Sequence, residues 1–321
     1  MQYWEIVTRS FRISWNHKYL WLIALFSGEG GAGFSYSYNQ STGRGTNTPN
    51  VAELQHQVTT WISDHIGLIV LLAILWLMLV VAFFILGAVC EGATVRASAE
   101  HDAERPFGLG WAWRSGVSTM WVMVRYRLLL VALALPIVLI VGGFIFAVAA
   151  SIANDNKGAA IALVLLTLLL VLAAIPYFFY LFFLDRLGTR AVVLEQIGAR
   201  AAIVRAHRLL FKRLGRALLA LLLAIGVGIA LGILVACALA IVAFPLAIIG
   251  AVLFASGSAP AWPLIVIAVI ILLPITLVVG GFLAAQSSTY WTLAFRRLDL
   301  EPVQPYYQPV QPPPPPPQAT S

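Results

Sequence analysis

Charge is what this sequence has least of. Only 10% of its 321 residues are Asp, Glu, Lys or Arg, whereas soluble globular domains carry about 25%. Hydrophobic residues make up 61%, and one stretch, residues 217–295, holds no charged residue. This composition excludes an ordinary soluble fold and predicts a polytopic membrane protein with helical spans.

Cysteines and metal-ligating patterns are also scarce. The two cysteines, Cys90 and Cys237, lie within apolar runs, which favours packing roles and excludes a disulfide framework. No two of the five histidines share a metal-ligand spacing with a carboxylate on one helix face. Nucleophile-elbow and phosphate-loop motifs are lacking too. We therefore expect a non-enzymatic protein with no cofactor, no metal and no catalytic residue.

The apolar runs are long enough for six membrane spans. A hydrocarbon core of about 30 Å needs about 20 residues, and the candidate spans cover 20–34, 66–90, 128–154, 158–184, 217–255 and 263–286. Pro245 is expected to end the fifth span. The sequence thus predicts an all-α, six-span membrane domain over residues 1–300, with an outer loop at 28–64. A disordered, Pro-rich tail follows at 301–321.

The basic residues predict the orientation of these spans. All but two of the 20 Lys and Arg residues fall in segments on one side of the predicted bilayer, and the exceptions are Arg44 and Lys157. Because Lys and Arg concentrate in cytoplasmic loops, we expect both termini to be cytoplasmic. The predicted location is the inner (plasma) membrane.

The chain also shows an internal pattern of three pseudo-repeats, at about 3–98, 110–195 and 199–297. Each has an amphipathic elbow helix followed by a helical hairpin. The exits of the first two repeats align, with Glu91 and Asp185 each five residues before an arginine, Arg96 or Arg190. We predict inter-repeat pairing of Glu91 with Arg190 and of Asp185 with Arg96, because a carboxylate at that depth needs a partner or water. An ion or substrate gate is the alternative interpretation.

The most basic elbow lies at 186–216 and is broken at Gly198. Its second half places four basic residues at steps of three and four, and so on one helical face. These are Arg205, Arg208, Lys212 and Arg216. Such a helix lies flat at a membrane surface, so we expect it to contact anionic lipid headgroups rather than nucleic acid. In the next span, Gly228 and Gly232 form a small-xxx-small pair that predicts close helix packing.

Two segments resemble a known family. Residues 190–198 (RAVVLEQIG) with 205–209 (RAHRL), and the closing residues 288–298 (STYWTLAFRRL), resemble the membrane domain found beside bacterial glycerophosphodiester phosphodiesterases. The resemblance covers most of residues 1–300. Ala206 and His207 depart from it, standing where that family often has Ser and an aromatic residue. No soluble segment exceeds about 40 residues, so the resemblance implies membrane embedding without the catalytic domain.

The leading hypothesis is an integral membrane protein that acts as a structural, scaffold or regulatory component and contacts anionic lipid headgroups. The alternative is a transporter or permease-like protein that uses a cavity between the repeats. Few polar residues lie deep within the spans, which weighs against the transporter. The expected partners are membrane lipids and a protein that binds the Pro-rich tail. The sequence does not specify an oligomeric state.

Overall fold

A computed structural model of the chain describes residues 3–27, 61, 63, 65–154, 156–256 and 262–299. Within these residues the chain is helical and forms no strand. The predicted tail at 301–321 and nearly all of the predicted outer loop at 28–64 lie outside the described residues. The all-α class predicted from composition is therefore confirmed for the described part of the chain.

Five of the described helices are long and apolar enough to cross a membrane: α4, α5, α6, α8 and α9. The predicted first span is represented by α2 alone, which has 8 residues. The count of six spans therefore stays a prediction. The helix bounds are α1 Tyr3–Asn16, α2 Tyr19–Phe26, α4 Ile66–Asp102, α5 Leu109–Ala153, α6 Lys157–Leu194, α7 Ala199–Lys212, α8 Leu214–Ser256 and α9 Trp262–Asp299.

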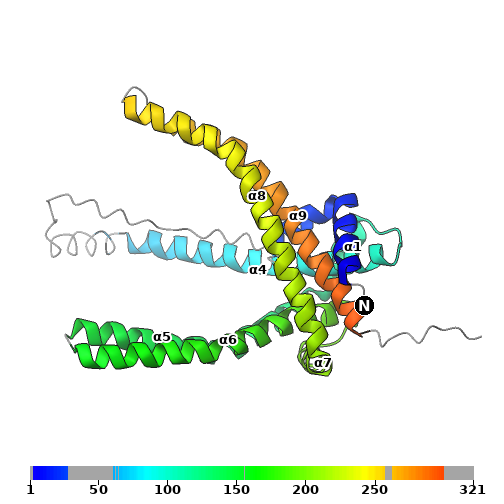
Figure 1. The fold of residues 1–321 in the computed structure, drawn as a ribbon, viewed down its shortest axis with the longest axis horizontal. Helices are drawn as coiled ribbons and strands as arrows, with labels where there is room; N and C mark the ends of the chain where they lie inside the picture. Colours follow the sequence, from blue (N-terminus) through cyan, green and yellow to red (C-terminus); the bar gives the residue numbers. More distant parts are fainter. Residues whose placement is uncertain are drawn as a thin grey trace, which may run out of the picture.

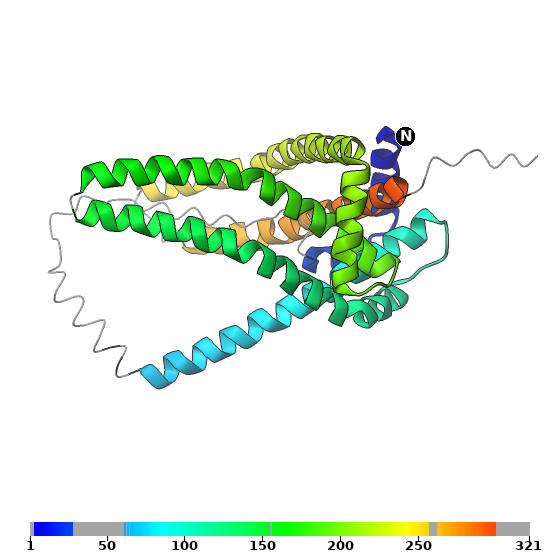
Figure 2. The same cartoon turned by 90° about the horizontal axis from the view of Figure 1, so that it is seen from below.

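The helices form a common base from which three arms diverge (Figures 1 and 2). The arms are the first part of α4, the α5–α6 hairpin and the α8–α9 hairpin. The base contains α1, α2 and α7 together with the inner ends of the long helices. At 45 residues, α5 is about 68 Å long at 1.5 Å per residue. It therefore extends well beyond a hydrocarbon core of about 30 Å.

Burial separates the arms from the base along single helices. In α4, Trp76 is 67% exposed whereas Ala97 is completely buried. The exposed side chains of the arms are large and apolar, which a soluble protein does not tolerate over such an area. Because a lipid bilayer solvates apolar side chains, the pattern suits arms in lipid and a protein-packed base at one end.

Glycines allow the helices of the base to approach closely. A Cβ on Gly281 of α9 would lie 2.6 Å from the Trp21 carbonyl oxygen of α2, and a Cβ on Gly188 of α6 would overlap the hydroxyl of Tyr126 of α5. Small residues at such crossings allow backbones to pack together. The predicted pair Gly228 and Gly232 does not serve this purpose, since a Cβ on either residue would have no described atom within 4 Å.

Two predicted helix boundaries are wrong. The predicted elbow of the second repeat is not a separate helix, because α5 runs unbroken through it into the span. Pro245 lies inside α8 and does not end it. A membrane helix tolerates an internal proline because local adjustments and neighbouring groups satisfy the freed backbone carbonyl. Separate elbow helices are found only in the first and third units of the described chain, as α1 and α7.

The glycine contacts predict opposite effects for two alanine substitutions. Gly188→Ala should lower the free energy of unfolding in detergent by about 1–3 kcal/mol, because the new methyl group overpacks the crossing with Tyr126. Gly142→Ala is the matched control, since nothing lies within 4 Å of its Cβ position, and it should raise stability by up to about 1 kcal/mol. Thermal or denaturant unfolding measures both. Equal effects of the two variants would contradict close packing at Gly188.

Candidate functional site

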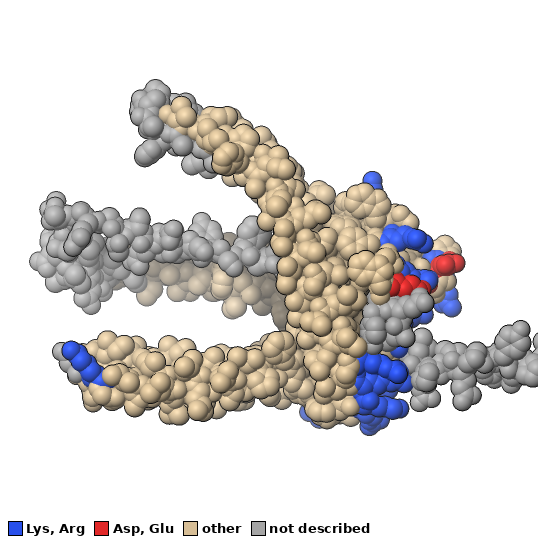
Figure 3. Space-filling view, viewed as in Figure 1, with Lys and Arg blue, Asp and Glu red and all other residues tan. Residues whose placement is uncertain are grey.

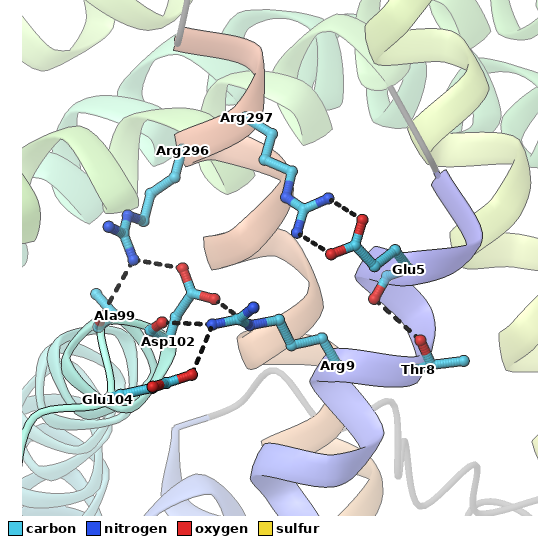
Figure 4. Close-up of polar contacts among 8 residues, drawn as sticks. All are labelled: Glu5, Thr8, Arg9, Ala99, Asp102, Glu104, Arg296 and Arg297. Atoms are coloured by element: carbon cyan, nitrogen blue, oxygen red, sulfur yellow. Dashed lines mark hydrogen bonds and ion pairs between the residues drawn. The ribbon is translucent and has the colours of Figure 1, made fainter. Parts of the chain in front are cut away.

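An ionic cluster joins three helices in the base. Asp102, the last residue of α4, lies between Arg9 of α1 and Arg296 of α9 (Figure 4). The Nε of Arg9 is 2.6 Å from Oδ1 of Asp102, and Nη1 of Arg296 is 2.5 Å from Oδ2. One carboxylate therefore connects the first described helix to the last described one.

The same two arginines also cap the end of α4. Arg9 donates from Nη2 to the Asp102 carbonyl oxygen at 2.7 Å, and Arg296 donates from Nη1 to the Ala99 carbonyl oxygen at 3.1 Å. The last carbonyls of a helix lack partners within the helix and carry the negative end of its dipole. Two guanidinium groups thus stabilise both the carboxylate and the helix terminus.

A second ion pair fastens α1 to α9 at the surface. Arg297 donates to both carboxylate oxygens of Glu5 at 3.3 Å. The hydrogen bond and the positive charge of Arg297 lower the pKa of Glu5 below its usual value. Because this pair is exposed, its contribution to stability is small and weakens in salt.

Beneath these charges, hydroxyl and amide groups form a buried polar seam between α1, α4 and α9. The hydroxyls of Ser98 and Thr289 share a hydrogen bond of 2.9 Å, and Ser14 donates to Thr289 at 3.4 Å. Gln286 donates to Ser10 at 3.5 Å. Paired polar groups of this kind fix the register of helices, since a slip would leave them buried without partners.

A cavity of about 420 Å³ opens where α4 diverges from α5 and α6. We call it the fork cavity. One part of its wall is apolar and another carries both signs of charge. Its lining residues are Phe26, Ser27, Phe83, Phe84, Gly87, Glu91, Arg127, Leu130, Val131, Asp185 and Arg186.

Glu91 and Arg127 form an ion pair at the charged side of the fork cavity. Glu91 is 3% exposed, and its carboxylate accepts from Nη2 of Arg127. The same Nη2 donates to the Ser27 carbonyl oxygen at 3.1 Å, and the guanidinium lies 5.8 Å from the centre of the Phe84 ring. These contacts hold the Arg127 head in one place.

The predicted inter-repeat pairs have different outcomes. Arg96 forms its ion pair with Glu100 at 2.8 Å, one turn along α4, so the predicted Asp185–Arg96 pair is replaced by a local one that needs no second helix. Arg190 is completely buried and donates to the carbonyl oxygens of Arg186 at 3.1 Å and of Ser288 at 3.5 Å. Its pairing with Glu91 stays a prediction.

The elbow helix α7 has three sides rather than two. One side packs into the base through Ala202, Ala206, Leu209 and Leu210. A second side exposes apolar groups, with Val204 54% and Phe211 57% exposed. The third side is basic.

Of the four predicted headgroup-binding residues, two are placed differently from expectation. Arg205 forms an ion pair with Glu195 at 3.1 Å. Arg216 lies in α8, because the chain turns at Arg213 between the two helices. Arg208 and Lys212 remain together on α7 and are exposed, and Arg216 is exposed at the start of the next helix.

Several residues of these clusters were not anticipated from the sequence. Arg9, Asp102, Arg127 and Arg296 make the principal ion pairs of the base, yet no motif within a single segment indicates which of them are partners. The signal that could have identified them is their position at the inner ends of apolar runs. Among the described residues, no group of three or more His, Cys, Asp or Glu side chains could hold a metal ion.

Comparison with known proteins matches most of the chain to a family model. Residues 7–294 match the model of a family described as "Family of unknown function (DUF7544)". No curated protein matches the chain. No solved structure matches it either. The resemblance to the membrane domain of the phosphodiesterase type stays a prediction.

The shared carboxylate predicts energetic coupling between α1 and α9. Asp102→Asn should lower the melting temperature in detergent more than Arg12→Gln, because Arg12 is exposed and makes no contact of this kind in the described chain. Arg9→Gln and Arg296→Gln should each destabilise the protein, and the double variant should differ from the sum of the two by at least about 0.5 kcal/mol. Strict additivity would contradict a shared carboxylate.

Proposed function

Because this chain belongs to DUF7544, a family of unknown function, we propose its function from the geometry of the described residues. It is a non-enzymatic integral membrane component whose base lies at the cytoplasmic leaflet and contacts anionic lipid headgroups. Its role is structural, as a scaffold or a regulatory component of the inner membrane. The proposal includes a sixth span that contains α2, and it places both termini in the cytoplasm.

The three-sided α7 is the observation that carries this proposal. A helix packed only on protein would not expose Val204 and Phe211 beside Arg208 and Lys212. A helix at a bilayer surface does so, because its apolar side enters the acyl boundary while its basic side meets headgroups. The exposed apolar residues continue into α8 at Leu214 and Leu218, which leads from the surface into an arm.

The distribution of charge supports the same placement. Lys and Arg gather over the base, at the end from which the arms diverge (Figure 3). The α4, α5–α6 and α8–α9 arms carry one basic residue among them, Lys157, at the start of α6. This asymmetry is typical of a cytoplasmic base. It also favours anionic lipid, since each basic residue near such a surface contributes about 1 kcal/mol.

A second candidate function is that of a permease-like protein. The fork cavity between the first two predicted repeats is the observation that favours it. A transport pathway also needs polar groups along the arms. Residues 66–86 and 128–153 contain no charged residue, so the described arms offer a substrate little beyond the cavity itself, and the scaffold is the better supported of the two.

Orientation can be tested with single cysteines in a background carrying Cys90→Ala and Cys237→Ala. A cysteine at Asn154, at the α5–α6 turn, should react with an impermeant thiol reagent from outside intact cells. A cysteine at Ala201, exposed on α7, should react only after the cells are opened. The opposite pattern would overturn the orientation based on positive charge.

Lipid contact by α7 can be tested on the full chain in nanodiscs. In the same cysteine-free background, a polarity-sensitive fluorophore on Val204→Cys should report a more apolar environment in anionic than in neutral lipid. High salt should weaken the difference, and so should Arg208→Gln combined with Arg216→Gln, which removes about 2 kcal/mol of attraction. Lys157→Gln is the control for lost charge. Identical fluorescence spectra in anionic and neutral lipid would contradict lipid contact by α7, and the basic residues would then serve only to orient the protein during membrane insertion.

A further inference from the structure

Three features of the fork cavity define what it can bind. It has a fixed guanidinium, Arg127, on one side and aromatic and aliphatic side chains on another. It opens toward the exposed apolar arms, since Phe83 and Val131 in its wall are 54% and 56% exposed. An occupant must therefore present an acceptor group to Arg127 and an apolar body to the arms.

Arg127 retains hydrogen-bond donors for such an occupant. Both of its hydrogen bonds, to Glu91 and to Ser27, use Nη2. A guanidinium carries five N–H donors, and within the described chain those on Nε and Nη1 have no acceptor. Gly87 lacks a side chain beside them: a Cβ there would lie 3.3 Å from Nη1. The group is thus held in place by one nitrogen and open at the others.

Distance along the helices places these charges at one depth. Glu91 lies about 38 Å from the start of α4, Arg127 about 39 Å from the end of α5, and Asp185 about 42 Å from the start of α6, at 1.5 Å per residue. A bilayer is about 30 Å thick in its hydrocarbon core and about 40–45 Å with its headgroups. Spans that begin at the outer surface therefore reach the inner headgroup layer at these residues.

We propose that the fork cavity binds one phospholipid of the cytoplasmic leaflet. Arg127 donates to the phosphate diester from Nε and Nη1, because a guanidinium matches two phosphate oxygens at once. The acyl chains lie along Phe83, Phe84, Leu130 and Val131 toward the space between the arms. The inference rests on the proposed membrane placement but not on lipid contact by α7.

The cavity also carries carboxylates, which balance the positive charge of its arginines. Glu91 already neutralises part of the Arg127 charge, and Asp185 and Arg186 add one charge of each sign to the wall. A site without net charge does not need a highly charged headgroup. It recognises the phosphate diester that membrane phospholipids share, which distinguishes it from the basic surface of α7.

Native mass spectrometry of the delipidated full chain tests this site. Dioleoylphosphatidylglycerol should form one saturable adduct, whereas dioleoylglycerol, which has the same chains and no phosphate, should not. Arg127→Gln should weaken the adduct about tenfold, which corresponds to about 1.4 kcal/mol. Arg125→Gln is the matched control: Arg125 is two residues away on α5, exposed, and packed on Trp121 at 5.7 Å.

A second variant keeps the test valid if Arg127→Gln fails to fold. Val131→Trp fills the apolar wall without touching the ion pair and should also weaken the adduct at least tenfold with an unchanged melting temperature. Equal binding of dioleoylglycerol, an unaltered adduct in Val131→Trp, or competition by inorganic phosphate at equal concentration would each overturn the proposal. Arg208→Gln should leave the adduct intact, so failure at the fork and failure at α7 are distinguishable.

Discussion

The base depends on ion pairs between helices, which give buried and half-buried carboxylates their partners. An isolated charge in a packed interior costs several kcal/mol, and removal of one partner from a buried pair costs about as much. Asp102 meets this requirement with arginines from the first and last described helices. Glu91 meets it with Arg127 of the neighbouring helix. These ion pairs hold α1 and α9 against the end of α4, and α5 against α4.

Close packing accompanies these ion pairs. The helices α1, α2, α4 and α9 pack at short range, which the glycines and the seam of serine and threonine side chains permit. The seam adds hydrogen bonds where larger apolar groups would not fit. At other crossings of the base, Tyr126 of α5 donates to the Leu184 carbonyl oxygen of α6 at 2.5 Å, and Tyr290 of α9 donates to the Ala220 carbonyl oxygen of α8 at 2.7 Å. Packing and polar pairing therefore act at the same crossings.

Much of the architecture was predictable because composition alone separates lipid-facing from water-facing residues. The long apolar runs identified α4, α5, α6, α8 and α9, and the spacing of basic residues identified α7. Individual partners were not predictable. Repeat symmetry suggested Arg96 for Asp185, but Glu100 lies one turn from Arg96 on the same helix. Sequence reasoning treated Gly228 and Gly232 as packing residues, whereas the close approaches occur at glycines such as Gly188, which stand outside any motif.

The contrast between arms and base imposes two kinds of evolutionary constraint on one helix. The exposed side chain of Trp76 in α4 needs only to be apolar, and many residue types would satisfy that requirement. Farther along the same helix, Glu91 is constrained by its ion pair with one guanidinium. Gly92 is constrained by the Thr119 side chain, which a Cβ would approach at 2.8 Å. Substitutions should therefore be tolerated more readily in the arms than in the base. Sequence similarity between relatives of such a protein should therefore persist longest at the inner ends of its spans.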